Sequence, residues 1–477
     1  MTTVPLTTGS PPSAEVLPLG VSAPEWPVLR FEGSDRALTD QLLAPLRGAG
    51  RTWWALFVLS VLGTALFVFC IWYTVAKGIG VWGNNIPVAW AFAITDFVWW
   101  IGIGHAGTFI SAFLLLLNQH WRASINRVAE AMTIFALVQA GLFPILHLGR
   151  PWFFYWLIPY PATMGVWPNF KSALPWDIAA VTTYFTVSLL FWYAGLVPDL
   201  ATARDYVTSH LARRIYGVFA LGWRGASAEW RQHRVAMVLL AALATPLVVS
   251  VHSVVSLDFS IAQLPGWHST IFPPYFVVGA IYSGFAMVFL LILPLRWAYG
   301  LENVITRRHL DAMAKLTLVM GLMLTYAYVI ELFVSWYSHD PNERFTCIVE
   351  RPLGTYAVIY WIMIACNVAL PQVLWWKRCR TSVPVLYAVS GAILAGMWLE
   401  RFIIIVTSLH RDFLPASWRF YRPTWVDLGL LAGSVGFFSL LFLLFVRFVP
   451  FVAISEVKRL RHELAANGGR EIGLPHA

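Results

Sequence analysis

The amino-acid sequence predicts an all-α integral membrane protein that crosses the membrane ten times. Of its 477 residues, 58% are apolar and only 12% are charged, and the mean hydropathy is +0.66. A soluble globular domain carries about 25% charged residues, so this composition indicates a lipid environment. The chain also contains ten apolar runs of roughly 20 residues, the length that a helix needs to cross the hydrocarbon core.

Each apolar run is one predicted span, and the polar stretches between the runs are loops. The spans cover approximately residues 53–79, 88–117, 125–146, 176–197, 235–255, 275–299, 313–336, 355–376, 384–408 and 425–449. Residues 1–52 are rich in Pro, Ser and Thr and contain no short apolar region with a cleavage site. We therefore expect a tail there and no signal peptide, and residues 450–477 form a second tail.

The positions of Lys and Arg predict the orientation, because loops on the cytoplasmic side retain positive charge. Roughly three quarters of the 33 Lys and Arg residues lie in the two tails and around the loops after the second, fourth, sixth and eighth spans. Both termini are therefore predicted to be cytoplasmic, and the formal net charge of +9 is mostly a topology signal. Nucleic-acid binding would need basic residues on one exposed face, which nothing in the sequence requires.

The order of the spans predicts two groups of four. The second to fifth spans (88–255) and the sixth to ninth spans (275–408) each begin outside, so they could form two four-helix bundles of the same orientation. The spans 53–79 and 425–449 would flank these bundles. The cytoplasmic segment 198–234 is basic with scattered apolar residues, which is typical of an interfacial helix.

The external segment 147–175 is dense in Pro and aromatic residues, among them Trp152. These aromatics could form the belt that membrane proteins place at the lipid interface. They could equally form a lid over a pocket and a docking surface for an external partner.

Metal chemistry within this chain has no support in the sequence. The four cysteines are scattered singly, with no C-x-x-C motif and no Cys/His cluster of metal-ligand spacing. We therefore expect no iron–sulfur cluster, zinc site or c-type haem held by this chain alone.

Ionisable residues near the outer ends of the spans are the main candidates for function, since charges at membrane depth are costly. His147 ends the third span, Asp177 opens the fourth, and His252 and Asp258 close the fifth. Arg401 lies in the outer half of the ninth span. Four different helices thus place His, Asp, Asp and Arg at one depth, which predicts a shared site.

Each of these residues also has an ordinary structural explanation. Asp177 could satisfy free amides in the first turn of its helix. Asp258 could be a loop carboxylate, Arg401 could pair with a neighbouring carboxylate, and His147 could bond to a carbonyl at a helix end. These separate explanations do not predict that the four residues lie at the same depth in the membrane.

A second set of polar residues could relay protons. His105 lies near the middle or inner half of the second span, where it could instead be a packed histidine among glycines. A haem held by His147 and His252 is a remote alternative, because axial ligands must face each other at one depth; His105 and His252 are predicted to lie at different depths. The candidate relay comprises Asp96, His105, Tyr326, Tyr328, Glu331 and Glu400.

Four sequence motifs resemble a known family. They are TDFVWWIGIGHAGT in the second span, LFPILHLGRPWFFYWLIPYP from the third, and SVHSVVSLDFS with PGWHSTIFPPYFVVGAI around the sixth. From about residue 50 to 450 the chain is similar to the NrfD/PsrC family, the membrane subunits of the polysulfide-reductase type. Within that family it most resembles the ActC type of quinol-binding subunit found in bacterial alternative complex III.

The resemblance implies a quinol-oxidising subunit of a respiratory complex in the bacterial cytoplasmic membrane, with a quinol pocket at the periplasmic side. It implies an iron–sulfur partner of the molybdopterin-oxidoreductase type on the outer face, a second NrfD-like membrane protein, cytochrome c subunits and lipids. The quinone would be menaquinone or ubiquinone. His147, Asp177, Asp258 and Arg401 match the family's pocket residues, which the depths of these residues indicate separately.

A quinol gives up two protons with its two electrons, so the pocket needs proton acceptors. Neutral His147, of ordinary pKa near 6.5, is the first expected acceptor. Asp177 and Asp258 would orient it or take the second proton, Arg401 would keep a neighbouring carboxylate ionised, and Trp152 with other loop aromatics would cover the ring. The competing classes are a transporter, which should show charges near the midplane and broken helices, and a purely structural anchor.

Overall fold

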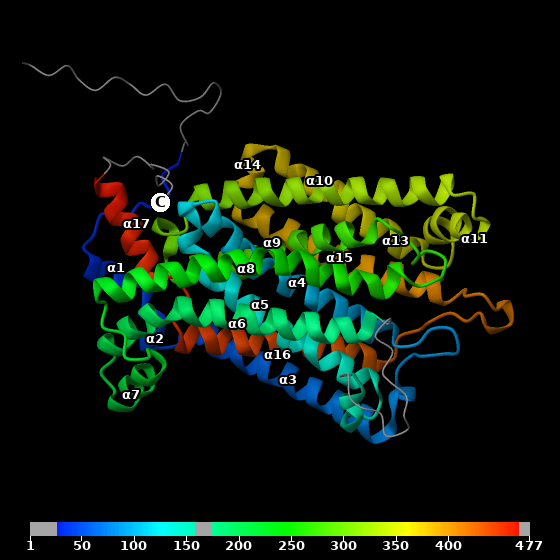
Figure 1. Cartoon of the computed structure of the whole chain (residues 1–477), viewed down its shortest axis with the longest axis horizontal. Helices are drawn as coiled ribbons and strands as arrows, with labels where there is room; N and C mark the ends of the chain where they lie inside the picture. The colour runs from blue at the N-terminus through cyan, green and yellow to red at the C-terminus, as the bar shows by residue number, and fades with distance from the viewer. Residues whose placement is uncertain (1–25, 158–172, 467–477) are drawn as a thin grey trace, which may run out of the picture.

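The computed structural model describes residues 26–157 and 173–466 and contains ten long apolar helices (Figure 1). The prediction of an all-helical protein with ten spans is confirmed. The spans are α3 (Arg51–Lys77), α4 (Ala91–Leu116), α5 (Asn126–His147), α6 (Ala173–Tyr206), α8 (Ser227–Ser260), α9 (Phe272–Ala298), α10 (Arg307–Tyr337), α13 with its continuation (Ala357–Trp375), α15 (Val383–Leu409) and α16 (Trp425–Phe448).

Short helices lie at both ends of this bundle. At one end α1 (Asp35–Leu42), α2 (Ala44–Arg47), α7 (His210–Phe219) and α17 (Ile454–Ala466) lie together on the left of Figure 1. This is the predicted cytoplasmic end. At the opposite, predicted outer end lies α11 (Pro341–Arg344).

Helices α4 and α9 form the centre of the bundle. They are buried over 78% and 83% of their most apolar stretches, whereas α3 is buried over only 17%. Both are apolar on all sides, as a helix surrounded by other helices must be. Helix α4 packs against α5, α8, α9 and α15, so a polar side chain on α4 faces protein and not lipid.

Helices α3 and α16 form a closely packed pair at the edge of the bundle. A Cβ atom added at Gly436 would lie 2.6 Å from Cα of Gly63, and one added at Gly433 would lie 2.7 Å from Cα of Phe67. Such near-contact of backbones requires glycine, and it is a common basis of helix association in membranes.

Two helices extend further than the apolar pattern predicts. The predicted spans 176–197 and 235–255 are here parts of α6 and α8, both of which continue through polar residues at the predicted cytoplasmic end. The start of α8 is stabilised by Glu229, whose carboxylate accepts the backbone N–H groups of residues 224–226. The predicted interfacial helix in segment 198–234 corresponds to α7.

Candidate functional site

Asp177 and Asp258 meet at the predicted outer end. Asp177 lies in the first turns of α6 and Asp258 near the end of α8, and these antiparallel neighbours pack along their length. The two carboxyl groups lie within interaction range of each other, and two neighbouring carboxyl groups in a buried site favour sharing one proton. Within the described part of the chain, Oδ1 of each aspartate is buried and has no hydrogen-bond partner.

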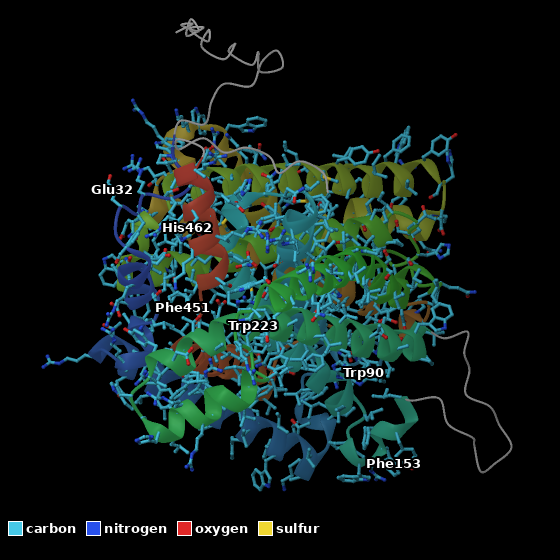
Figure 2. The ribbon with its side chains drawn as sticks, turned by 60° about the vertical axis from the view of Figure 1, so that its left-hand side comes forward. Glu32, Trp90, Phe153, Trp223, Phe451 and His462 are labelled. Atoms are coloured by element: carbon cyan, nitrogen blue, oxygen red, sulfur yellow. The ribbon has the colours of Figure 1, made fainter. Side chains whose placement is uncertain are left out.

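His147, the last residue of α5, sits in an aromatic box. The Trp90 ring stacks on it at 5.3 Å between centroids, and Trp82 and Phe97 approach it edge-on at 6.2 and 6.4 Å. The imidazole bonds to the backbone of Ala93, while its buried Nε2 has no partner among the described residues. A proton on Nδ1, the nitrogen that would donate to Ala93, would leave Nε2 as an acceptor. Figure 2 shows Trp90 toward the end of the molecule opposite to Glu32 and His462.

Arg401 lies deeper, about two turns before the outer end of α15 at Leu409. It forms an ion pair with Glu400 at 2.8 Å, and its guanidinium lies 4.0 Å above the Phe276 ring of α9. Its positive charge also acts on His252. In the described residues no hydrogen bond or ion pair joins Arg401 to His147 or to either aspartate, so the four predicted site residues do not form one contact cluster.

His105 and His252 form a pair that the sequence did not predict. Their Nδ1 atoms lie 2.9 Å apart, and both rings are fully buried. The expectation that they lie at different depths is wrong. Helix α8 continues past the predicted span to Ser260, so His252 lies inside the membrane and not at its edge. Tyr184 of α6 stacks on His105 at 4.6 Å.

Three of the predicted relay residues, Tyr328, Glu331 and Glu400, line one small buried cavity. The Tyr328 hydroxyl donates to Glu400, and the Asn367 amide donates to the Tyr328 oxygen at 2.9 Å. Asn367 lies in a wide π-helical turn that interrupts the eighth span, a feature often found at functional sites. Glu331 pairs with Arg351 at 2.8 Å, and a small cavity of about 20 Å³ separates Glu331 and Glu400.

Three predicted site residues lie apart from these groups. Trp152 is 58% exposed on the external segment, and Tyr326 is 63% exposed on the outward face of α10. The Asp96 carboxylate accepts the indole N–H of Trp398 at 2.8 Å, and its other oxygen is buried without a described partner. Most of the predicted aromatic lid, 158–172, lies outside the described residues.

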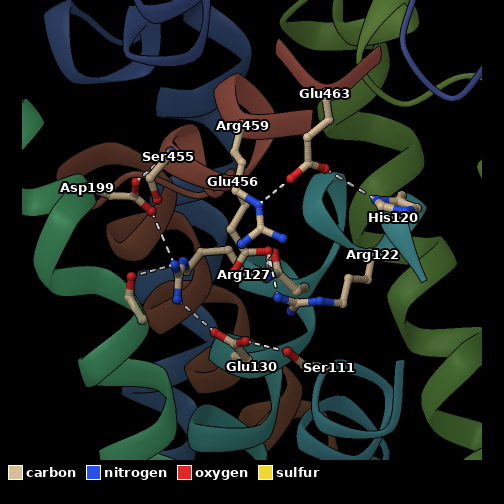
Figure 3. Close-up of polar contacts among 12 residues, drawn as sticks. Ser111, His120, Arg122, Arg127, Glu130, Asp199, Ser455, Glu456, Arg459 and Glu463 are labelled. Atoms are coloured by element: carbon tan, nitrogen blue, oxygen red, sulfur yellow. Dashed lines mark hydrogen bonds and ion pairs between the residues drawn. The ribbon is translucent and has the colours of Figure 1, made fainter. Parts of the chain in front are cut away.

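A buried ionic cluster at the predicted cytoplasmic end was missed by the sequence analysis (Figure 3). Arg127 pairs with Glu130 at 2.9 Å and with Asp199 at 3.1 Å, and all three side chains are almost fully buried. Asp199 also accepts the backbone N–H of Ser455 at 3.0 Å. Glu130 lies within the predicted span 125–146. A carboxylate at membrane depth was the one feature of the sequence that could have indicated this cluster.

Polar groups continue from this cluster toward the histidine pair. The Ser111 hydroxyl donates to Glu130 at 2.5 Å. One turn further along α4, Thr108 lies beside the Tyr184 hydroxyl together with Thr133 and Ser188. Because the Tyr184 ring stacks on His105, buried polar side chains lie between the Arg127 cluster and the His105–His252 pair.

A second ionic cluster lies at the predicted outer end. Glu350 accepts a bond from His410 Nε2 at 3.0 Å and pairs with Arg411 at 2.7 Å. Burial lowers the pKa of His410 below its usual value. This cluster ties the loop after α10 to the end of α15.

The fold and the buried polar groups define a polytopic membrane protein with a polar site inside its helical bundle. Residues 80–411 match the family described as polysulphide reductase, NrfD, and the chain belongs to this family. It is 24% identical over 389 residues to a Halobacterium salinarum protein described as a membrane subunit of dimethyl sulfoxide reductase, covering 80% of this chain and 83% of that protein. It is 23% identical over 378 residues to a selenate reductase subunit of Mesobacillus selenatarsenatis, covering 74% and 84%.

Proposed function

We propose that the chain is the quinol-oxidising subunit of a respiratory oxidoreductase of the alternative complex III type. One observation carries this proposal: His147 Nε2, Asp177 Oδ1 and Asp258 Oδ1 are buried acceptors for which the described residues provide no partner. Buried polar atoms are nearly always satisfied, so such atoms mark the place of a ligand or of ordered water. Two ring hydroxyls of a quinol would supply the missing donors.

The proposed reaction removes two electrons and two protons from the bound quinol. His147 accepts the first proton at Nε2, because its Nδ1–H is held by Ala93 and the aromatic box fixes its ring. The Asp177–Asp258 pair already shares one proton, so it can accept another and pass one to the outer surface. Arg401 pairs with the Glu400 carboxylate at 2.8 Å and so fixes the position of this carboxylate.

The electrons leave to an iron–sulfur subunit on the outer face, of the molybdopterin-oxidoreductase type. The proposed complex also holds a second NrfD-like membrane protein and cytochrome c subunits, in the cytoplasmic membrane of a bacterium. Trp152 supports this proposal, because an exposed tryptophan on the predicted external segment suits contact with a partner or with lipid head groups.

The test is quinol-driven reduction of the partner's iron–sulfur clusters in the purified complex. His147→Gln and Asp177→Asn should each lower the rate about 10²- to 10⁴-fold, the usual contribution of a general base. The controls are His339→Gln and Asp205→Asn, which change exposed residues away from the site. Full turnover in either site variant, in a complex with all its subunits, would contradict the site assignment.

The alternative is a quinone-reactive anchor of a reductase, since the two relatives are described as subunits of dimethyl sulfoxide and selenate reductases. The same membrane site would then serve a different terminal reaction. Supplying the complex with quinol and, in turn, cytochrome c, polysulfide, dimethyl sulfoxide or selenate distinguishes the two. Reduction of cytochrome c supports the alternative complex III type, and reduction of only a small-molecule acceptor contradicts it.

A second proposed function is proton translocation, which the His105–His252 contact favours. It joins the polar groups between Glu130 and Tyr184 to the centre of the membrane, next to Arg401 and Glu400. Turnover in sealed vesicles should then release more protons outside than the two that each quinol carries. Glu130→Gln should reduce this excess without reducing quinol oxidation by uncoupled vesicles. Release of two protons per quinol by the unmodified complex would contradict translocation.

A further inference from the structure

A large open pocket lies at the predicted cytoplasmic end, far from the quinol site. Its volume is about 1070 Å³. Its wall is formed by α1, α2, the end of α6, helix α7, the end of α16 and α17. Figure 1 shows α7 next to α2 at this end of the bundle.

The pocket carries an excess of positive charge. Each of its three acidic residues already has a cationic partner: Asp40 pairs with Arg47, Asp35 with Arg461, and Asp205 with Arg204. The remaining cations in the wall are Arg36, Arg447 and Lys458. Arg447 donates to the Pro45 carbonyl at 2.7 Å, and in the described ranges none of these three forms an ion pair with a carboxylate.

The pocket opens at the level where the hydrocarbon core ends. Helix α16 ends at Phe448 in the pocket wall, and helix α3 begins at Arg51, a few residues after Arg47, whereas the end of α6 at Tyr206 projects beyond the core. The pocket is therefore within reach of lipid head groups at the membrane surface.

Helix α7 gives the pocket an apolar border. Leu211, Ile215, Val218 and Phe219 follow the i, i+4, i+7, i+8 pattern of one helix face, and all four are exposed. Ala212 and Tyr216 on another face line the pocket. A helix at the end of the spans with an exposed apolar face lies in the lipid interface, so its apolar side chains would contact acyl chains.

We propose that this pocket binds the head group of an anionic glycerophospholipid, with Arg36, Arg447 and Lys458 around its phosphate. The unpartnered Tyr206 hydroxyl, buried in the wall, is a further donor to the head group. The charge favours an anionic lipid over phosphatidylcholine, whose own cation would compete with these side chains. The apolar face of α7 favours a lipid over a soluble phosphate compound, which has no acyl chain to cover it.

The experiment measures lipid binding to the purified complex by native mass spectrometry and by the midpoint of thermal unfolding. Phosphatidylglycerol should bind and raise the midpoint more than phosphatidylcholine does. Each cation near a membrane surface contributes about 1 kcal/mol, or about fivefold in affinity. The triple variant Arg36→Gln, Arg447→Gln, Lys458→Gln should therefore bind phosphatidylglycerol about 100-fold more weakly.

The matched control is the triple variant Arg231→Gln, Arg307→Gln, Arg378→Gln, which removes the same charge from exposed positions outside the pocket. It should bind like the unmodified complex. Arg36→Lys with Arg447→Lys, which keeps the charge, should also retain binding if the pocket variant loses it for electrostatic reasons and not through misfolding.

Three results would overturn the proposal. One is equal loss of binding in the pocket and control variants. Another is the same stabilisation by inorganic phosphate as by phosphatidylglycerol, which would assign the pocket to a soluble phosphate compound. The third is a protein chain, and no lipid, that accompanies the unmodified complex and is lost from the pocket variant.

Discussion

Arg127 illustrates how much a single buried charge holds in this membrane protein. Its guanidinium lies between Glu130 and Asp199 and also donates to the Gly195 carbonyl at 2.7 Å. Gly195 is required there, since a Cβ atom at this position would come within 2.4 Å of the guanidinium. This one cation thus joins helices α5 and α6.

We predict that Arg127→Met destabilises the protein by about 3–5 kcal/mol, because it leaves two buried carboxylates without their partner. The measurement is the free energy of unfolding in detergent. Arg231→Met, at an exposed position on α8, should change it by no more than about 0.5 kcal/mol. Similar values for the two variants would show that the Arg127 cluster adds little to stability.

We expect His410 to make the stability of the folded protein depend on pH. Burial lowers its pKa in the folded protein. As the pH falls below about 6.5, the unfolded chain therefore binds a proton that the folded chain does not, and stability declines. The decline is at most about 1.4 kcal/mol per pH unit for one group, and it ends below the lowered pKa.

This effect is measured as the unfolding midpoint at pH 7.5 and at pH 5.5. The difference between the two should be smaller in His410→Gln than in the unmodified protein, and His339→Gln, at an exposed position, should leave it unchanged. An undiminished difference in His410→Gln would assign the pH dependence to other groups.

The close contact between helices α3 and α16 is expected to contribute to stability. Gly436→Ala places a methyl group against Cα of Gly63, so the helices must separate and the unfolding midpoint should fall. Gly391→Ala, in α15, adds the same group where nothing lies within 4 Å, and should be neutral or stabilising by up to about 1 kcal/mol. Equal effects of the two substitutions would mean that this close approach does not matter.

The apolar pattern of the sequence predicts the ten spans well but their ends poorly. Hydropathy reports which residues tolerate lipid, whereas α6 and α8 continue beyond the membrane on hydrogen bonds and caps such as that of Glu229. This error also hid the His105–His252 contact, because a shorter α8 places His252 at the membrane edge.

The candidate site shows the same limit. Asp177 and Asp258 lie at the outer ends of two consecutive spans, so their similar depth in the membrane predicted that they would lie close together. Depth says nothing about rotation, so it could not show that Tyr326 faces outward while Tyr328, half a turn away, faces Glu400. Arg127 was interpreted as an orientation signal, because a charge at a span end does not reveal whether it is buried.

At the scale of the whole molecule, ten spans place the two described chain ends on one side of the membrane. The prediction that this side is the cytoplasm is testable with single cysteines in a background without Cys70, Cys347, Cys366 and Cys379. In right-side-out vesicles, a membrane-impermeant maleimide should label Asn342→Cys at the predicted outer end and not Gln232→Cys at the other. The opposite pattern would invert the orientation. The division into two four-helix groups, 88–255 and 275–408, also stays a prediction.

The contact between Asp199 and Ser455 has a consequence for biogenesis. Asp199 follows the fourth span, whereas Ser455 opens the last helix of the described chain, so the ribosome makes the two ends of this bond more than 250 residues apart. Arg122 likewise forms its ion pair, at 2.8 Å, only after Glu456 of α17 has been synthesised. The first spans must therefore remain in the membrane with an incomplete ionic cluster until translation is almost finished. A nascent chain released before residue 455 lacks the α17 partners of Asp199 and Arg122. We expect quality-control proteases to recognise such a chain by these unpaired charged groups.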